Sequence, residues 1–102
     1  MTAATENDPT FYDRADSFIH LANEHANTIG RGKVSASFMY GMSRFNAWVS
    51  ACGFDSAEQM KEERGEVVDY FVAQYKAMLE ENFEDYADHF EKYMRPPKAS
   101  PL

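Results

Sequence analysis

The sequence predicts an all-α fold, a small bundle of three to four helices with a long or kinked C-terminal helix. Residues 34–52 contain a single charged side chain, Arg44, although charged residues make up 26% of the chain. A helix with so little charge must be covered on most sides, so we expect it at the centre of the bundle. Elsewhere apolar residues recur at intervals of three and four, and no alternating strand pattern persists. Every periodic segment is therefore read as helical.

The length and composition indicate one folded unit. A chain of 102 residues with 44% hydrophobic side chains has enough apolar surface for a single core. We expect a helical domain over residues 9–94, a flexible tail over residues 1–8, and a second, proline-containing tail over residues 95–102.

The first expected helix begins near Pro9, with Asp8 as its cap, and ends at Ile29. Gly30 follows as a residue able to adopt the positive φ that ends many helices. Its apolar stripe consists of Phe11, Ala15, Phe18, Ala22, Ala26 and Ile29. The opposite face is polar, which is typical of a helix with one side in solvent.

The second expected helix runs from about Ser35, a possible cap, to Cys52, with Gly53 ending it. Because the connection from Gly30 is short, we expect this helix to fold back antiparallel on the first. Its main stripe comprises Phe38, Met42, Phe45, Val49 and Cys52.

The third segment covers residues 56–94, where Ser56 and Gln59 have the spacing of a capping box. Two apolar stripes occur in it, and they are out of phase by one residue at Asn82. This predicts a kink or break near Asn82. A helix without that break would be about 58 Å long and would overhang its partners, which favours a homo-oligomer that covers the aromatic end.

Charge and targeting signals limit the possible partners. Residues 55–91 hold twelve acids and three bases, whereas residues 1–54 hold five acids and four bases. An acidic surface repels phosphate backbones, so we expect no direct nucleic-acid binding. The polar N-terminus lacks the features of a signal peptide, the polar groups in residues 34–52 disfavour a membrane span, and a lone Cys52 suits a reducing compartment. We therefore expect a cytoplasmic protein.

Several strings resemble a family of short bacterial proteins classed as a domain of unknown function. They are Phe11-Tyr12-Asp13-Arg14-Ala15-Asp16, Gly32-Lys33-Val34-Ser35-Ala36-Ser37, Arg44-Phe45-Asn46-Ala47-Trp48-Val49 and Leu79-Glu80-Glu81-Asn82. The likeness covers about Phe11 to Met94. The resemblance implies a small, bacterial, cytoplasmic helical protein, and it transfers no catalytic residue.

Arg44 is the first candidate functional residue. A buried guanidinium needs a partner, so we expect it to pair with an acid of another helix: Asp13, Asp16, Glu66 or Asp69. The alternative is a ligand pocket built from Arg44, Asn46, Trp48 and Asp69, with nearby tyrosines in its wall. Structural pairing is favoured, because buried charges usually occur as pairs.

Three other features are weaker candidates. Arg31, Lys33 and Ser35 lie where a helix begins, a place that can bind an anion, although a plain turn is the more ordinary interpretation. Asp16, His20 and Glu24 share a helix face, but too few ligands accompany them to predict a metal site. Cys52 has no neighbouring base in the sequence, so we expect a structural thiol. No cofactor motif is present, and we expect none to bind.

These observations leave two main candidate functions and a weaker third one. The first is a noncatalytic protein-interaction or regulatory module that self-associates, and the second is a small-molecule-binding protein or enzyme with a pocket around Arg44 and Trp48. A third, that the acidic face imitates nucleic acid, rests on charge alone.

Overall fold

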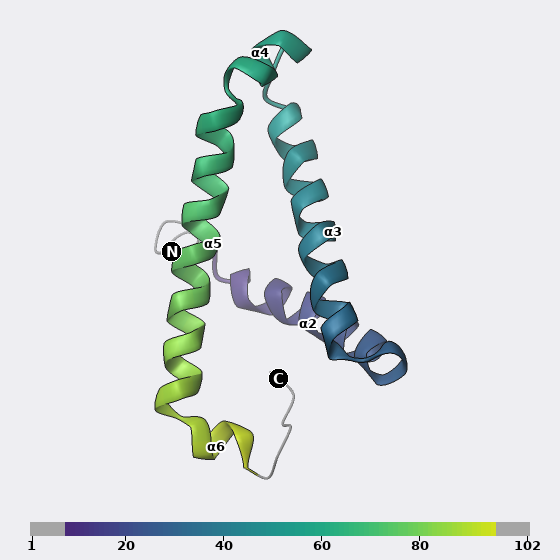
Figure 1. Cartoon of the computed structure of the whole chain (residues 1–102), viewed down its shortest axis with the longest axis vertical. Coiled ribbons are helices and arrows are strands. Elements are labelled where there is room, and N and C mark those ends of the chain that lie inside the picture. The colour runs from purple at the N-terminus through teal and green to yellow at the C-terminus, as the bar shows by residue number, and fades with distance from the viewer. Residues whose placement is uncertain (1–7, 96–102) are drawn as a thin grey trace.

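The computed structural model describes residues 8–95, and every regular element among them is a helix (Figure 1). In chain order these are α2 (Phe11–Ile29), α3 (Arg31–Ala51), α4 (Ala57–Glu62), α5 (Arg64–Asp88) and α6 (Phe90–Met94). The all-α prediction and the long C-terminal helix are thus confirmed. Most of the two predicted tails, residues 1–7 and 96–102, lies outside the described residues.

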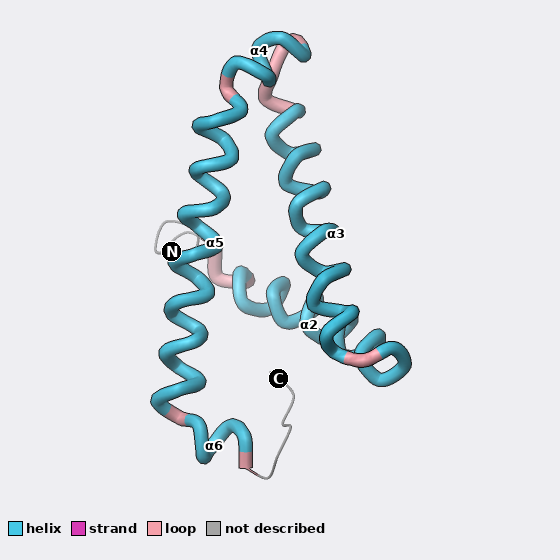
Figure 2. The backbone as a smooth tube through the Cα atoms, in the orientation of Figure 1, coloured by secondary structure: helices cyan, strands magenta, loops and turns pink. Residues whose placement is uncertain are grey.

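Helices α3 and α5 form two legs that meet at α4 and diverge from that apex (Figures 1 and 2). Helix α2 crosses below α3, and α6 turns off the far end of α5. The chain measures 52 × 32 × 23 Å along its principal axes. Its radius of gyration of 16.4 Å exceeds the value of about 13 Å that is typical of a compact 100-residue domain.

The start of α2 differs from the expectation. The helix begins at Phe11 rather than near Pro9, and Asp8 does not cap it through its side chain. The Asp8 carboxylate instead forms an ion pair with Arg14, one turn into the helix, and also accepts a hydrogen bond from the Thr10 hydroxyl. The guanidinium of Arg14 offers this carboxylate a charged partner, which competes with the backbone N–H groups that a cap would satisfy.

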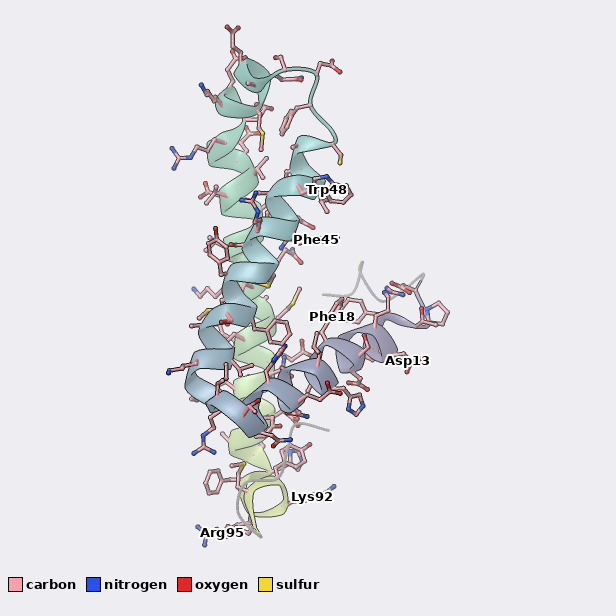
Figure 3. The ribbon with its side chains drawn as sticks, turned by 90° about the vertical axis from the view of Figure 1, so that its right-hand side faces the viewer. Asp13, Phe18, Phe45, Trp48, Lys92 and Arg95 are labelled. Atoms are coloured by element: carbon pink, nitrogen blue, oxygen red, sulfur yellow. The ribbon has the colours of Figure 1, made fainter. Side chains whose placement is uncertain are left out.

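The junction between α2 and α3 is a single residue, Gly30, with φ of 91°. The predicted end of α2 at Ile29 is confirmed, because an L side chain rarely adopts this φ. Helix α3 starts at once at Arg31, so Ser35 lies inside the helix and is not its cap. The antiparallel hairpin is also wrong: α2 and α3 diverge from Gly30 as an open V (Figure 3).

Ser56 caps α4 as predicted. Its hydroxyl accepts a hydrogen bond from the Gln59 backbone N–H at 3.1 Å. The Gln59 side chain reaches back and accepts from the Asp55 backbone N–H at 2.7 Å. The two bonds satisfy backbone donors at the entrance to a helix that is only six residues long.

The predicted break near Asn82 is wrong, since α5 continues through it to Asp88. The Asn82 side chain donates a hydrogen bond to the Met78 carbonyl at 2.8 Å, so its amide is satisfied within the helix. The interruptions fall at Glu63 and His89, which flank α5. The two apolar stripes, although out of phase by one residue, both fit on one unbroken helix because α5 is apolar over a wide arc.

The apolar side chains of this fold are largely uncovered. Val34, near the α2–α3 junction, is the one buried side chain in residues 8–95, with 8% of its surface exposed. The expectation that neighbours enclose residues 34–52 is therefore wrong for the single chain. Nothing within the described residues covers this segment.

Candidate functional site

Exposed large apolar side chains occur on α2, α3, α5 and α6, and most of them lie on α3 and α5. Helix α3 carries Phe38, Met42, Phe45 and Val49 along one stripe, with Trp48 beside it. Each of these side chains is more than two-fifths exposed. Figure 3 shows Phe45 and Trp48 on the part of α3 beyond its junction with α2, and Phe18 on the part of α2 that diverges from α3. The rings of Phe45 and Trp48 lie 5.6 Å apart and contact each other.

Helix α5 carries apolar residues on two adjoining faces. Val67, Phe71 and Met78 are partly covered. A second set, which we call the exposed stripe, is 40–73% exposed and consists of Val68, Val72, Tyr75, Leu79 and Phe83. Monomeric soluble proteins rarely expose a contiguous apolar surface of this extent, so these faces are candidate interfaces.

A cleft lies at the apex, where α3 ends and α5 begins. It has a volume of about 360 Å³ and is shallow and largely open to solvent. Its lining residues are Ser50, Phe54, Glu63, Glu66, Val67, Tyr70 and Phe71. The Ser50 hydroxyl already donates to the Asn46 carbonyl at 2.8 Å, so the cleft offers two carboxylates and a largely aromatic wall.

Sequence reasoning missed this cleft. Its residues come from segments that meet only because the chain reverses around α4, and their spacing in the sequence gives no sign of this. The short distance between the predicted end of the second helix and the Ser56 cap was the one available signal that the two helices meet here.

Arg44 is exposed, and it makes no ion pair or hydrogen bond within residues 8–95. The predicted buried pair with Asp13, Asp16, Glu66 or Asp69 is therefore wrong for the single chain. The physical reason is that α3 is open on this side, so the guanidinium remains in water and needs no protein partner.

The four residues of the predicted ligand pocket are not brought together as a set. Arg44 and Trp48 are one turn apart and share a face of α3, whereas Asn46 is two residues from each and lies on another side of the helix. Asp69 is on α5. None of the four lines the apex cleft.

The predicted anion-binding residues fall in the first turns of α3. Arg31 and Lys33 are exposed in the opening turn, where free backbone N–H groups also lie. Ser35 is one turn too far along to cap the helix. Anion binding here stays a prediction.

Other chemistry is sparse in the part of the chain that the structure describes. No three His, Cys, Asp or Glu side chains converge there as metal ligands would. Cys52 is a free thiol, exposed rather than covered as its apolar pattern suggests. No helix over residues 8–95 combines the length and hydropathy needed to cross a membrane.

A cluster of polar side chains lies at the turn between α5 and α6. The Tyr93 hydroxyl donates to Asp85 Oδ1 at 3.4 Å, and His89 Nδ1 lies 3.2 Å from the same oxygen. Partial burial and the neighbouring carboxylate raise the pKa of Tyr93 above its usual value of 10. This cluster stabilises the helix end, and none of its members lines the cleft.

Comparison with known proteins gives a relative but no activity. A solved structure, the NMR structure of the protein NB7890A from Shewanella sp., is 41% identical in sequence and superposes with a TM-score of 0.73. The match covers 90% of this chain and 98% of that one. No curated protein matches. The family described as protein of unknown function (DUF3144) matches residues 11–87, and since this is most of the chain, the protein belongs to that family.

Proposed function

We propose that this protein is a noncatalytic interaction module that self-associates through its apolar helix faces. The supporting observation is the balance of burial in residues 8–95. One side chain, Val34, is buried, while eighteen large apolar or aromatic side chains are exposed. Burial of such side chains provides most of the free energy that folds a domain, and a second copy provides surface for it.

The accessible area supports the same proposal. The chain exposes 8656 Å², whereas a compact monomer of 11.7 kDa exposes about 5900 Å². The difference is larger than the roughly 800 Å² per partner that a standard stable interface buries. A dimer can therefore form and still leave apolar surface for a further protein partner, which is how we envisage a regulatory role.

The test is sedimentation velocity over a wide range of protein concentration, at physiological salt. We expect a dimer that dissociates on dilution. We expect the variant Phe83→Ser, which removes a large ring from the exposed stripe of α5, to weaken the dimer. Its matched control, Tyr70→Ser, removes an exposed ring from another face of the same helix and should leave the dimer unchanged. A monomer at every concentration would refute self-association.

We place the protein in the cytoplasm as part of this proposal. Its single cysteine is a free, exposed thiol, a state that a reducing compartment preserves. Fractionation of cells that express the protein at native level tests this placement.

The second candidate function is binding of a small anionic ligand beside Arg44 and Trp48. The favouring observation is that the Arg44 guanidinium has no partner in residues 8–95, while Tyr40 and Trp48 lie one turn before and after it. Addition of benzoate, and separately of phosphate, to ¹⁵N-labelled protein tests this. Saturable shifts of the Trp48 indole N–H that Arg44→Gln abolishes would support it, and unchanged spectra would remove it.

A further inference from the structure

The exposed stripe of α5 has a geometry that specifies how a second copy binds. We infer that two copies pair through this stripe with their α5 helices antiparallel, related by a two-fold axis that passes between residues 73 and 74. The inference rests on the proposed self-association and adds to it the surface, the orientation and the register.

The residues at the two ends of this face of α5 differ in the size of their side chains. Phe83 is the most exposed of the large apolar side chains in residues 8–95, at 73%. Gly65 lies 18 residues earlier, and 18 residues are five full turns of an α-helix, so the two positions share one line along α5. No side chain other than those of its chain neighbours lies within 4 Å of the place where a Cβ of Gly65 would be. One end of the stripe is a projecting ring and the other is an open recess.

An antiparallel pair places each projection over a recess. With the two-fold axis between residues 73 and 74, Phe83 of one copy is level with residue 64 of the second copy, about 1.5 Å along the helix from Gly65, so that its ring reaches Gly65. In the same register Leu79 faces Val68 of the second copy, and Tyr75 faces Val72. Gly at the contact lets the aromatic ring approach the backbone closely, and the other four residues of the stripe meet one another in apolar pairs.

A parallel pair lacks this complementarity. It would set Phe83 against Phe83 and Gly65 against Gly65, which crowds one end and leaves a void at the other. The antiparallel pair covers about 27 Å of helix from residue 65 to residue 83 without either defect.

Charge favours the same orientation. Residues 77–88 of α5 contain five acids and no base, whereas residues 64–76 contain two acids and two bases. A parallel pair would align the two acidic halves, while the antiparallel pair sets each acidic half beside a neutral one.

One edge of the stripe adds a specific attraction. Asp69 and Lys76 are seven residues apart and therefore lie on the same edge of α5. Both are exposed, and neither has an ion-pair partner within the described part of its own chain. In the antiparallel register, Asp69 of each copy lies near Lys76 of the other, so that two such pairs form across the axis.

The experiment is selective disulfide trapping in a Cys52→Ser background. One chain carries Phe83→Cys and a purification tag that changes its size, and a second chain carries Gly65→Cys. The two are mixed under mild oxidation and separated without reductant. We expect one product, the mixed dimer, because the antiparallel register brings residues 83 and 65 together.

Each other outcome has a definite meaning. Homodimers of each variant would show a parallel pair and overturn the inference. No cross-link, or a random mixture, would also overturn it, although self-association would survive if sedimentation still finds a dimer. A wild-type monomer at high concentration would refute the proposed function itself.

A measurement on the unmodified chain guards against misfolded variants. Gly65 and Phe83 are about 27 Å apart along their own helix, so no nuclear Overhauser effect can connect them within one copy. We expect an effect between the Phe83 ring and the Gly65 Hα in a mixture of ¹³C-labelled and unlabelled protein. Its absence from a sample that sediments as a dimer would overturn the inference.

Discussion

The Tyr93 hydroxyl donates a hydrogen bond to Asp85 Oδ1 across the turn that ends α5, and the rings of Tyr93 and Tyr86 lie 5.0 Å apart. The same carboxylate lies within reach of His89. Asp85 thus holds α6 at an angle to α5 through two residues that follow it in the chain.

The first prediction concerns the ionisation of Tyr93. The Asp85→Asn variant should lower the pKa of Tyr93 toward 10, because the negative charge that opposes tyrosinate is removed, while partial burial keeps some of the rise. A pH titration of the Tyr93 ring by NMR measures this. Glu91→Gln, which removes a carboxylate that pairs with Arg95 instead, is the control and should leave the titration unchanged.

The raised pKa of Tyr93 also determines how the stability of the fold changes with pH. The folded chain favours the neutral phenol, so this contribution to stability is complete below pH 10 and is lost as the pH rises through the raised pKa of Tyr93. An Asp85→Asn variant whose stability falls with alkaline pH as steeply as that of the wild type would contradict the assignment.

The second prediction tests the cap of α4. Ser56→Ala should lower the free energy of unfolding by about 1 kcal/mol, because the Gln59 backbone N–H loses its acceptor. Urea denaturation measures the change. Ser43→Ala is the control, since the Ser43 hydroxyl donates to the Tyr40 carbonyl within a continuous helix, and its effect should stay within about 0.5 kcal/mol. Equal losses in the two variants would speak against a specific cap.

The third prediction compares two glycines at the α2–α3 junction. Gly30→Ala should destabilise the chain by about 1–2 kcal/mol, since alanine is strained at φ of 91°. Gly32→Ala should be neutral or stabilising by up to about 1 kcal/mol, because Gly32 is helical and the space around it is open. Thermal unfolding of both variants at one protein concentration measures the contrast, and a harmless Gly30→Ala would mean that the junction can relax.

The fourth prediction concerns charge at the α5 interface. Lys76→Glu should raise the dissociation constant of the dimer roughly tenfold, because each of the two symmetry-related contacts with Asp69 becomes a repulsion. Sedimentation equilibrium measures this, and added salt should reduce the difference. Lys33→Glu makes the same change in charge on α3 and should have a much smaller effect. The double variant Asp69→Lys/Lys76→Glu should regain affinity if the contact is direct.

Local signals in the sequence were sufficient for several helix ends. Ile29, Gly30 and Ser56 lie where expected, because a positive φ and a side-chain cap each depend on a few adjacent residues. The entry to α2 was misplaced because the Asp8 carboxylate had a competing partner, Arg14, whose reach depends on the conformation of the intervening residues.

The break assigned to Asn82 shows a limit of periodicity. Two stripes out of phase can mean two helices, or one helix that is apolar on two adjoining faces. The sequence around Asn82 is compatible with either, and the hydrogen bond from its side chain to the Met78 carbonyl satisfies the amide without a break. The exposed stripe became recognisable only when α5 proved continuous.

The environment of Arg44 could not be predicted for a different reason. Hydrophobic burial is not directional, so an apolar segment shows that it must be covered but not which chain covers it. The prediction of a buried ion pair for Arg44 assumed that other helices of the same chain cover α3. In the open arrangement of α2, α3 and α5 that assumption fails, and the Arg44 guanidinium lies in solvent.

The separation of the two legs also bears on how the chain folds. Because α3 and α5 meet only near the apex, most contacts are local, and local contacts allow helices to form within microseconds to milliseconds (Figure 1). If two copies pair as proposed, the slow step in reaching a fully buried state is their encounter. Its rate should rise with protein concentration, and the melting temperature should rise with it. Synthesis level in the cell would then control how much of the protein is folded as well as how much is made.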